Sequence, residues 1–369
     1  MQYPRILLLL TATLFAAGCA NLGYYSQAVT GQLDILAHTR AISELLDESP
    51  VTGSEPNAAM RPLAPAIKTR LTTVLRVRDF ATQVLALPDN GSYRVYADID
   101  RAQVAWNIVA TPEFSLTPKE WCFPVAGCVP YRGYFSQKRA QRFADTLRAD
   151  GQDVRVAGVA AYSTLGWFRD PVFSTQLRRS DADIAALIFH ELAHQKLYVG
   201  GDATFNESFA TAVETEGMRR WLVQGNDKTA LDNYLLERSR QTAFVDLLTK
   251  YRTHLAALFA TPLPEEKMRA EKARYYDMLR AEYVELRKLW GGYGGYDTWF
   301  TQDLNNAHLA SVGLYHQYVP AFQALLASVH GDLPAFYRLA RMLSYLSAAE
   351  RAARLTGLNG APTALITIK

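Results

Sequence analysis

The sequence predicts an α+β fold, with a mixed N-terminal half and a largely helical C-terminal half. Residues 91–114 and 153–168 alternate apolar and polar side chains and are rich in β-branched and aromatic residues, which is typical of strands. From Ser180 onward apolar residues recur at helical spacing almost throughout. No internal repeat and no linker rich in Gly, Pro or Ser interrupts the 369 residues, so residues 19–369 are expected to form one continuous unit.

The elements are predicted in a simple order along the chain. Apolar residues at helical spacing predict helices over 24–46 and 66–86. Strands follow at 91–100 and 104–114, then a helix over 136–150 and a strand over 153–168 that ends at the turn Arg169–Pro171. The glycine-rich stretch 291–299 is predicted to be a loop between two C-terminal helices. We divide the chain into four regions, 1–18, 19–150, 151–225 and 226–369.

Composition and charge exclude some classes of protein. Hydrophobic residues make up 49% and charged residues 20% of the chain, which is an ordinary globular composition and argues against disorder. The net charge is +3 and no dense run of Lys or Arg occurs, so a nucleic-acid partner has no electrostatic support. The sequence does not allow any protein partner to be inferred.

The N-terminus predicts export and a lipid anchor. Arg5 precedes twelve apolar or small residues, which is the length of a signal peptide and too short for a bilayer-spanning helix. The following "AAGC" resembles the bacterial lipobox, which predicts a signal peptide over 1–18 and lipidation of Cys19. Ala20 after the cysteine favours the outer membrane, with the protein facing the periplasm. A plain secretory signal and an uncleaved anchor are the alternatives.

Two further cysteines, Cys122 and Cys128, lie in "WCFPVAGCVPYRGYF". An even pair in an oxidising compartment predicts a disulfide that closes a small loop. Two free buried thiols are the alternative, and a cysteine metal site is less favoured because no other cysteine exists to complete it.

The stretch "FHELAHQKLYVGGDATFNESFAT", residues 189–211, is the strongest functional signal. Ser180 and Asp183 predict a capped helix start, and on such a helix His190 and His194 lie one turn apart on the same face. This spacing lets two imidazoles bind one metal ion, while Glu191 can reach a water on that ion without binding the ion itself. The alternative is that both histidines are structural residues of an ordinary capped helix.

A third ligand is expected from a second helix. "FNESFAT" predicts a helix with Asn206 as its N-cap, and the short loop at Gly200 predicts that the two helices are antiparallel. Glu207 would then lie level with the histidines and complete a His₂Glu zinc site with one open position. Asp202 and Glu214 are the competing ligands. A metzincin is excluded, because that class needs Gly and His where this chain has Leu197 and Gly200.

The strand before the first of these helices has a possible role in binding. An extended segment over 154–166 beside the metal site could receive a substrate backbone as an added strand. An interior strand of the core is an equally compatible interpretation.

HELAH followed by NESFA resembles the gluzincin class of zinc peptidases. The whole chain resembles a bacterial family of predicted zinc aminopeptidases of lipoprotein type. The matching stretches are "YYSQAVTGQLDIL", "WCFPVAGCVPYRGYF", "AYSTLGWFRDPV", "FHELAHQKLYV" and "FNESFATAVE". The resemblance implies a zincin-like core, consisting of a small sheet, the HExxH helix and an antiparallel helix that bears the ligand Glu207. It also implies one Zn²⁺ per chain and a peptide substrate.

The sequence predicts a membrane-anchored zinc peptidase. Aminopeptidase activity is the preferred hypothesis, and endopeptidase activity is the alternative within the same class. Glu191 is expected to act as general base. Tyr162, Tyr315 and His316 are candidate hydrogen-bond donors to the developing oxyanion, of which Tyr315 is preferred. Other residues are candidates for supporting roles. Asp202, Glu214 and Glu216 are candidate partners of the imidazoles, and Glu113, Asp170 and Glu214 are candidates for capture of a substrate amine. The remaining histidines are expected to be structural or surface residues: His38, His254, His308 and His330.

Two other functions fit the same sequence. The chain could be a zincin-fold lipoprotein that acts as a structural or peptide-binding module without turnover. It could also be a helical envelope lipoprotein in which HELAH occurs by coincidence. Metal content separates the coincidental HELAH from the other two hypotheses. Turnover of peptides separates the peptidase from the binding module.

Overall fold

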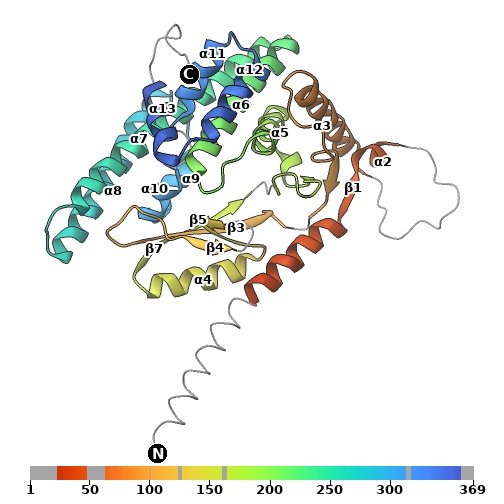
Figure 1. Cartoon of the computed structure of the whole chain (residues 1–369). Helices are drawn as coiled ribbons and strands as arrows, with labels where there is room; N and C mark the ends of the chain where they lie inside the picture. The colour runs from red at the N-terminus through yellow and green to blue at the C-terminus, as the bar shows by residue number, and fades with distance from the viewer. Residues whose placement is uncertain are drawn as a thin grey trace, which may run out of the picture.

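Helices lie on both sides of small β-sheets in this protein (Figure 1). The structure is a computed structural model, and it describes residues 23–47, 63–99, 101–123, 127–159, 164–312 and 317–358. Four residues named from the sequence, Cys19, Tyr162, Tyr315 and His316, lie outside the described residues. Among the described helices, none is both long and apolar enough to cross a bilayer. The α+β prediction is confirmed.

The N-terminal segment is less regular than predicted. A helix over residues 23–37 is followed by β1 (Thr39–Ala41) and α2 (Ile42–Leu46), so the single helix predicted over 24–46 is wrong over residues 38–41. The chain extends there because β1 pairs antiparallel with β2 (Val95–Ala97), a partner that local periodicity cannot reveal. The next helix, α3 (Pro65–Gln83), confirms the prediction over 66–86.

The strands form three small sheets. In the first, β2 lies between β1 and β8 (Val172–Phe173). In the second, β3 (Ala105–Pro112) lies between β6 (Arg132–Tyr134) and β7 (Gln152–Val159), with both pairings antiparallel. Strands β4 (Trp121–Phe123) and β5 (Gly127–Val129) form a separate pair, in which Cys122 and Cys128 are opposite each other and disulfide-bonded.

Strand β7 is shorter than predicted. It ends at Val159, and residues 164–170 form a closed turn instead of continuing the strand to residue 168. The reason is local, because Asp170 Oδ1 accepts hydrogen bonds from both the backbone N–H and the hydroxyl of Thr164. Within the described residues β7 pairs with β3 alone, so it lies at the edge of its sheet.

Most of the remaining chain is helical, as predicted. Helix α4 (Gln137–Ala149) covers one face of the second sheet (Figure 1). A short 3₁₀ turn, Gln176–Arg178, precedes the C-terminal helices. These helices are α5 (Asp181–Lys196), α6 (Ala203–Gln224), α7 (Lys228–Phe259), α8 (Glu265–Leu289), α9 (Asp297–Phe300), α10 (Asn306–Val312), α11 (Val319–Ser328), α12 (Leu333–Ser344) and α13 (Ala348–Leu358). The predicted loop over 291–299 is confirmed up to Tyr296, where α9 follows.

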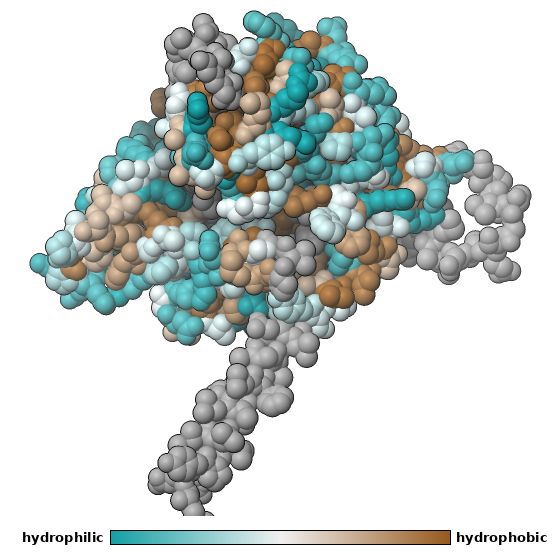
Figure 2. Space-filling model, in the orientation of Figure 1, coloured by the Kyte–Doolittle hydropathy of each residue, from teal (hydrophilic) through white to brown (hydrophobic). Residues whose placement is uncertain are grey.

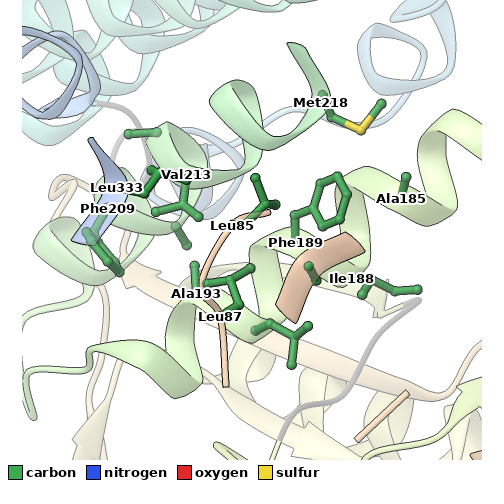
Figure 3. Close-up of a cluster of buried hydrophobic side chains, with 14 of the residues drawn as sticks. Leu85, Leu87, Ala185, Ile188, Phe189, Ala193, Phe209, Val213, Met218 and Leu333 are labelled. Carbon is green, nitrogen blue, oxygen red and sulfur yellow. The ribbon is translucent and has the colours of Figure 1, made fainter. Parts of the chain in front are cut away.

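The largest hydrophobic core surrounds α5 and α6. Figure 3 shows part of this core, with Phe189 and Ile188 of α5 and Phe209 of α6. Leu85, which precedes α5 in the sequence, and Leu333, which follows α6, belong to the same cluster. Helices α3, α11, α12 and α13 complete this core. Helices α7 and α8 enclose a second core with the segment around α9 and α10, and they extend away from the sheets as a hairpin (Figure 1). The segment that bears the HExxH pattern therefore belongs to the largest core.

Candidate metal centre

Helix α5 begins where the sequence predicts. The Ser180 hydroxyl accepts the backbone N–H of Asp183 at 3.1 Å, and the Asp183 carboxylate accepts the backbone N–H of Ser180 at 3.3 Å. This capping box satisfies two N–H groups that the first turn leaves free. Ile184, Ile188 and Leu192 are buried against the core, which fixes the rotation of the helix about its axis. His190 and His194 consequently face α6.

Helix α6 begins four residues earlier than predicted. Its N-cap is Asp202, whose carboxylate accepts the backbone N–H of Phe205 at 2.9 Å, so the assignment of Asn206 as N-cap is wrong. Asn206 is buried inside the first turns of the helix. Its amide accepts the N–H of Val199 at 2.7 Å and donates to the Val199 carbonyl at 2.8 Å, which fixes the loop between the two helices.

Three ligand-type side chains converge between the two helices. His190 Nε2 lies 3.2 Å from His194 Nε2 and 3.3 Å from Glu207 Oε2. His194 Nε2 lies 3.7 Å from Glu207 Oε1. Each of the three residues offers one ligand atom, and these atoms all lie within 4.8 Å of one another. The helices are antiparallel, as the pairing of His194 with Glu207 and of His190 with Glu214 requires.

The hydrogen-bonding capacity of His190 tests whether a cation fits. Its Nδ1 faces the Glu214 carboxylate at 3.1 Å, so in a neutral ring the proton belongs on Nδ1 and a lone pair remains on Nε2. That lone pair faces a carboxylate oxygen of Glu207, an arrangement that is repulsive unless a second proton or a metal cation lies between them.

The spacing of the atoms and their chemistry both suit zinc. Ligand atoms about 2.0–2.1 Å from a tetrahedral Zn²⁺ lie roughly 3.3 Å apart, close to the separations of 3.2 and 3.3 Å at His190 Nε2. Two imidazoles and one carboxylate form a known donor set for catalytic zinc. The three residues fit the ion that the sequence predicts.

The same charges set the protonation of the ligand residues. Burial alone would lower the pKa of His190, but its contacts with Glu207 and Glu214 raise this pKa well above its ordinary value. Burial alone would raise the pKa of Glu207, but the two imidazoles lower it. The site therefore holds Glu207 ionised and favours positive charge between the carboxylates.

Glu191 lies beside the donor atoms without joining them. Burial raises the pKa of its carboxyl, the two imidazoles oppose that rise, and the charges of Glu207 and Asp170 add to it. A carboxyl group with a raised pKa beside a candidate metal site is suited to accepting and returning a proton.

The residues weighed as partners of the imidazoles divide clearly. Glu214 hydrogen-bonds His190, and its other oxygen lies 3.5 Å from an Arg238 nitrogen on α7. Asp202 instead forms a buried ion pair with Arg351 of α13, at 2.7 Å. Glu216 pairs with two arginines of its own helix, Arg219 and Arg220. Glu214 is thus the partner that fixes the orientation of the first ligand.

The carboxylates weighed for capture of a substrate amine are engaged elsewhere. Glu113 pairs with Arg269 of α8. Asp170 is buried, bonds Thr164, and accepts the Gln195 amide at 3.1 Å. Gln195 also accepts from Asn90 at 2.7 Å, so it connects the turn 164–170 and the loop around Asn90 to the end of α5. Asp170 therefore acts in positioning the loops beside the metal site.

One residue next to the centre was missed by the sequence analysis. The Tyr198 ring lies 6.3 Å from the His194 ring, centroid to centroid, and is half exposed. Burial and the Glu207 charge raise the pKa of the Tyr198 hydroxyl, which places this group within the field of the third ligand. Its position four residues after His194 was the available signal, but α5 ends at Lys196 and Leu197 is extended. Helical spacing therefore could not locate the ring.

Comparison with known protein families identifies the family of this chain. The family model described as "Putative aminopeptidase" matches residues 23–355, which is most of the chain. The chain belongs to this family. The matched range includes the donor set, the Asp202–Arg351 ion pair and the helix over 23–37. Comparisons with curated proteins and with solved structures give no match.

Proposed function

We propose that this member of the aminopeptidase family is a zinc-dependent peptidase that removes N-terminal residues from peptides. The convergence of His190, His194 and Glu207, with Glu191 beside them, carries the proposal. One Zn²⁺ per chain would be held by these three side chains, and it would act as a Lewis acid on the peptide carbonyl and lower the pKa of a water to about 7. The family description supports the N-terminal preference.

The chain's own residues carry the proton transfers and hold the ligands in place. Glu191 accepts a proton from the attacking water and returns it to the leaving amine, a role for which its raised pKa is suited. Glu214 holds the proton on Nδ1 of His190 and keeps Nε2 free for the metal. Tyr198 is the described residue best placed to donate to the carbonyl oxygen as negative charge develops there. Tyr315, preferred from the sequence, stays a prediction.

The proposed location follows from the N-terminal sequence. Cys19 would carry the lipid and become the mature N-terminus, with Ala20 favouring the outer membrane and the enzyme facing the periplasm. The disulfide between Cys122 and Cys128 suits such an oxidising compartment.

The test is a digest of a peptide library by residues 20–369, loaded with zinc, with products read by mass spectrometry. Loss of one N-terminal residue at a time is expected. Glu191→Gln should keep its zinc and lose about a hundredfold or more in kcat, because the base is gone while the ligands remain. His190→Ala and Glu207→Ala should lose bound zinc. Glu216→Ala is the control, because Glu216 lies on α6 like Glu207 but outside the donor set. This variant should keep both zinc and turnover.

Other outcomes distinguish the remaining functions. Internal cuts would make the protein an endopeptidase. A folded, zinc-containing protein that cleaves nothing would support a binding module without turnover. A folded protein that binds no zinc would exclude the proposed zinc site. An active Glu191→Gln enzyme would exclude the general-base role of Glu191.

A further inference from the structure

The helix over residues 23–37 has an apolar face that is turned outward. Four large apolar side chains on it are exposed: Tyr25 at 41%, Val29 at 57%, Leu33 at 59% and Leu36 at 37%. At 100° per residue these four lie within a sector of about 80°, so they form one continuous stripe. We call these four residues the outer stripe. Figure 2 shows hydrophobic surface at the lower right of the molecule, where Figure 1 draws this helix.

The inward face of the same helix is more polar than the outer stripe. Gln27 is buried and accepts the backbone N–H of Phe135 at 3.1 Å. Gly31 lies so close to the Phe135 ring that a Cβ there would come within 2.2 Å of it. Ile35 is buried in a small cluster with Phe173. The orientation of the helix is therefore fixed by specific contacts, and rotation cannot bury the outer stripe against the rest of the fold.

The charges near the helix lie away from the outer stripe. Asp34 is on the opposite side of the helix, about 180° from Tyr25, and its carboxylate lies 3.3 Å from an Arg101 nitrogen. Arg132 stacks over the inward-facing Tyr24 ring at 4.1 Å. The outer stripe itself contains no ionisable side chain apart from the Tyr25 phenol. A surface of this kind suits an apolar partner and offers little to a charged one.

The position of the predicted anchor identifies that partner. Cys19 precedes Gly23, the first described residue of the helix, by four positions. An extended chain covers at most about 14 Å over that separation, so a lipid on Cys19 would hold the start of the helix next to the bilayer surface. From Tyr25 to Leu36 the outer stripe runs about 16 Å along the helix axis.

We propose that the outer stripe lies in the membrane surface and orients the enzyme on it, an inference that rests on the lipid anchor of the proposed function. The lipid supplies the first attachment and the stripe the second, which is the combination that stable anchoring needs. Figure 1 places the helix on the α4 side of the sheets, whereas α5 and α6 lie on the other side. The metal centre therefore faces away from the lipid and toward soluble peptides. Because the stripe has no cationic side chain, its binding does not depend on salt.

The experiment measures co-flotation of residues 20–369, which contain every described residue, with phosphatidylethanolamine–phosphatidylglycerol vesicles. Because this protein lacks the lipid, the stripe alone is expected to float a part of it, equally at 0.15 and 0.5 M salt, and V29S/L33S should bind at least about tenfold more weakly. L236S/V284S is the matched control, because Leu236 at 49% and Val284 at 50% exposure lie on α7 and α8, and it should float like the parent.

A probe of local environment makes the test specific to the stripe. Residues 20–369 contain only the disulfide-bonded Cys122 and Cys128, so Leu33→Cys adds one free thiol for a polarity-sensitive dye. A blue shift with vesicles is expected at position 33. Thr30→Cys, exposed on the same helix but off the stripe, should shift much less.

Three results would overturn the inference: no flotation of the parent protein, equal flotation of V29S/L33S, or a parent that sediments as a dimer and V29S/L33S as a monomer. The last result would assign the stripe to a second copy of the chain. The proposed function is tested by separate measurements. Mass spectrometry of the full chain detects a lipid on Cys19, and a peptide hydrolysis assay detects the peptidase activity. V29S/L33S should hydrolyse soluble peptides at the parent rate.

Discussion

At the scale of single residues, the site is defined by which carboxylate each histidine meets. Sequence spacing made Glu207, Asp202 and Glu214 all possible third ligands. In the structure Glu207 faces both Nε2 atoms, Glu214 faces Nδ1 of His190, and Asp202 pairs with Arg351. The three carboxylates thus have three different surroundings: Glu207 completes the candidate donor set, Glu214 fixes the orientation of His190, and Asp202 caps α6 and pairs with α13.

Tyr198 provides the first prediction at this scale. Tyr198→Phe removes one hydroxyl beside the metal site and leaves the packing of the ring on His194 in place. We expect kcat to fall by about a hundredfold, as for loss of one oxyanion donor, with KM and bound zinc little changed. Steady-state kinetics with a dipeptide substrate and metal analysis of the same sample check this. Tyr345→Phe, at a highly exposed position, is the control. Unchanged kcat in Tyr198→Phe would remove Tyr198 from the mechanism.

At the scale of elements, the metal centre depends on how closely α5 and α6 approach. Gly217 of α6 faces Phe189 of α5 and Leu85, and a Cβ at this position would lie 2.8 Å from a carbon atom of each. Only hydrogen fits there, so the glycine allows the two helices to pack at the separation that joins His190 to Glu214 and Glu207. Leu85 and Phe189 are fully buried, so their side chains have little room to move away from an added methyl group.

Gly217→Ala should therefore destabilise the protein despite the better helix propensity of alanine. Overpacking of a core costs about 1–3 kcal/mol and the propensity gain is about 1 kcal/mol, so we expect a net loss of up to about 2 kcal/mol in the free energy of unfolding. Urea unfolding followed by circular dichroism measures it. Gly357→Ala on α13, where nothing lies within 4 Å of the added carbon, should instead gain up to about 1 kcal/mol. Equal effects of the two substitutions would contradict the close-approach argument.

At the scale of the whole molecule, the helical hairpin of α7 and α8 is joined to the sheets through the segment before α10. Asn305 donates to the Val154 carbonyl at 3.2 Å, and Asn306 donates to the Glu113 carbonyl at 2.8 Å. His308 is buried in this junction and faces Gln302 and Asn305. The sequence analysis gave His308 a structural or surface role, and its burial identifies it as structural.

The junction makes stability depend on pH. Burial, together with the charges of Arg155, Arg148 and Arg280, lowers the pKa of His308 to about 3. In the unfolded chain the pKa is about 6.5, so between these values the unfolded state binds the extra proton and stability falls as the pH is lowered. His308 should contribute a loss of about 2 kcal/mol between pH 7 and pH 5.

His308→Gln isolates this contribution, because glutamine keeps hydrogen-bonding groups but does not titrate. Urea unfolding at pH 7 and pH 5 should show a smaller difference for His308→Gln than for the parent protein. His254→Gln, at an exposed position, should keep the parent difference. A parent-like pH dependence in His308→Gln would exclude the buried neutral imidazole as the cause.

Features that depend on one element at a time could be predicted from the amino-acid sequence alone. Helical spacing placed His190 and His194 on one face, the Ser180 capping box fixed where α5 begins, and the short loop after α5 made the second helix antiparallel. Each follows from the geometry of a single helix or turn, which is local in the chain.

Tertiary structure decided what depends on contacts between distant segments. It selected Glu207 over Asp202 by pairing Asp202 with Arg351, placed Tyr198 beside His194, and turned residues 39–41 into a strand against β2. It also oriented the helix over 23–37 with Gln27 and Ile35 inward and the outer stripe outward. Periodicity shows that a helix has an apolar face, but only the packing of its neighbours decides which face is buried.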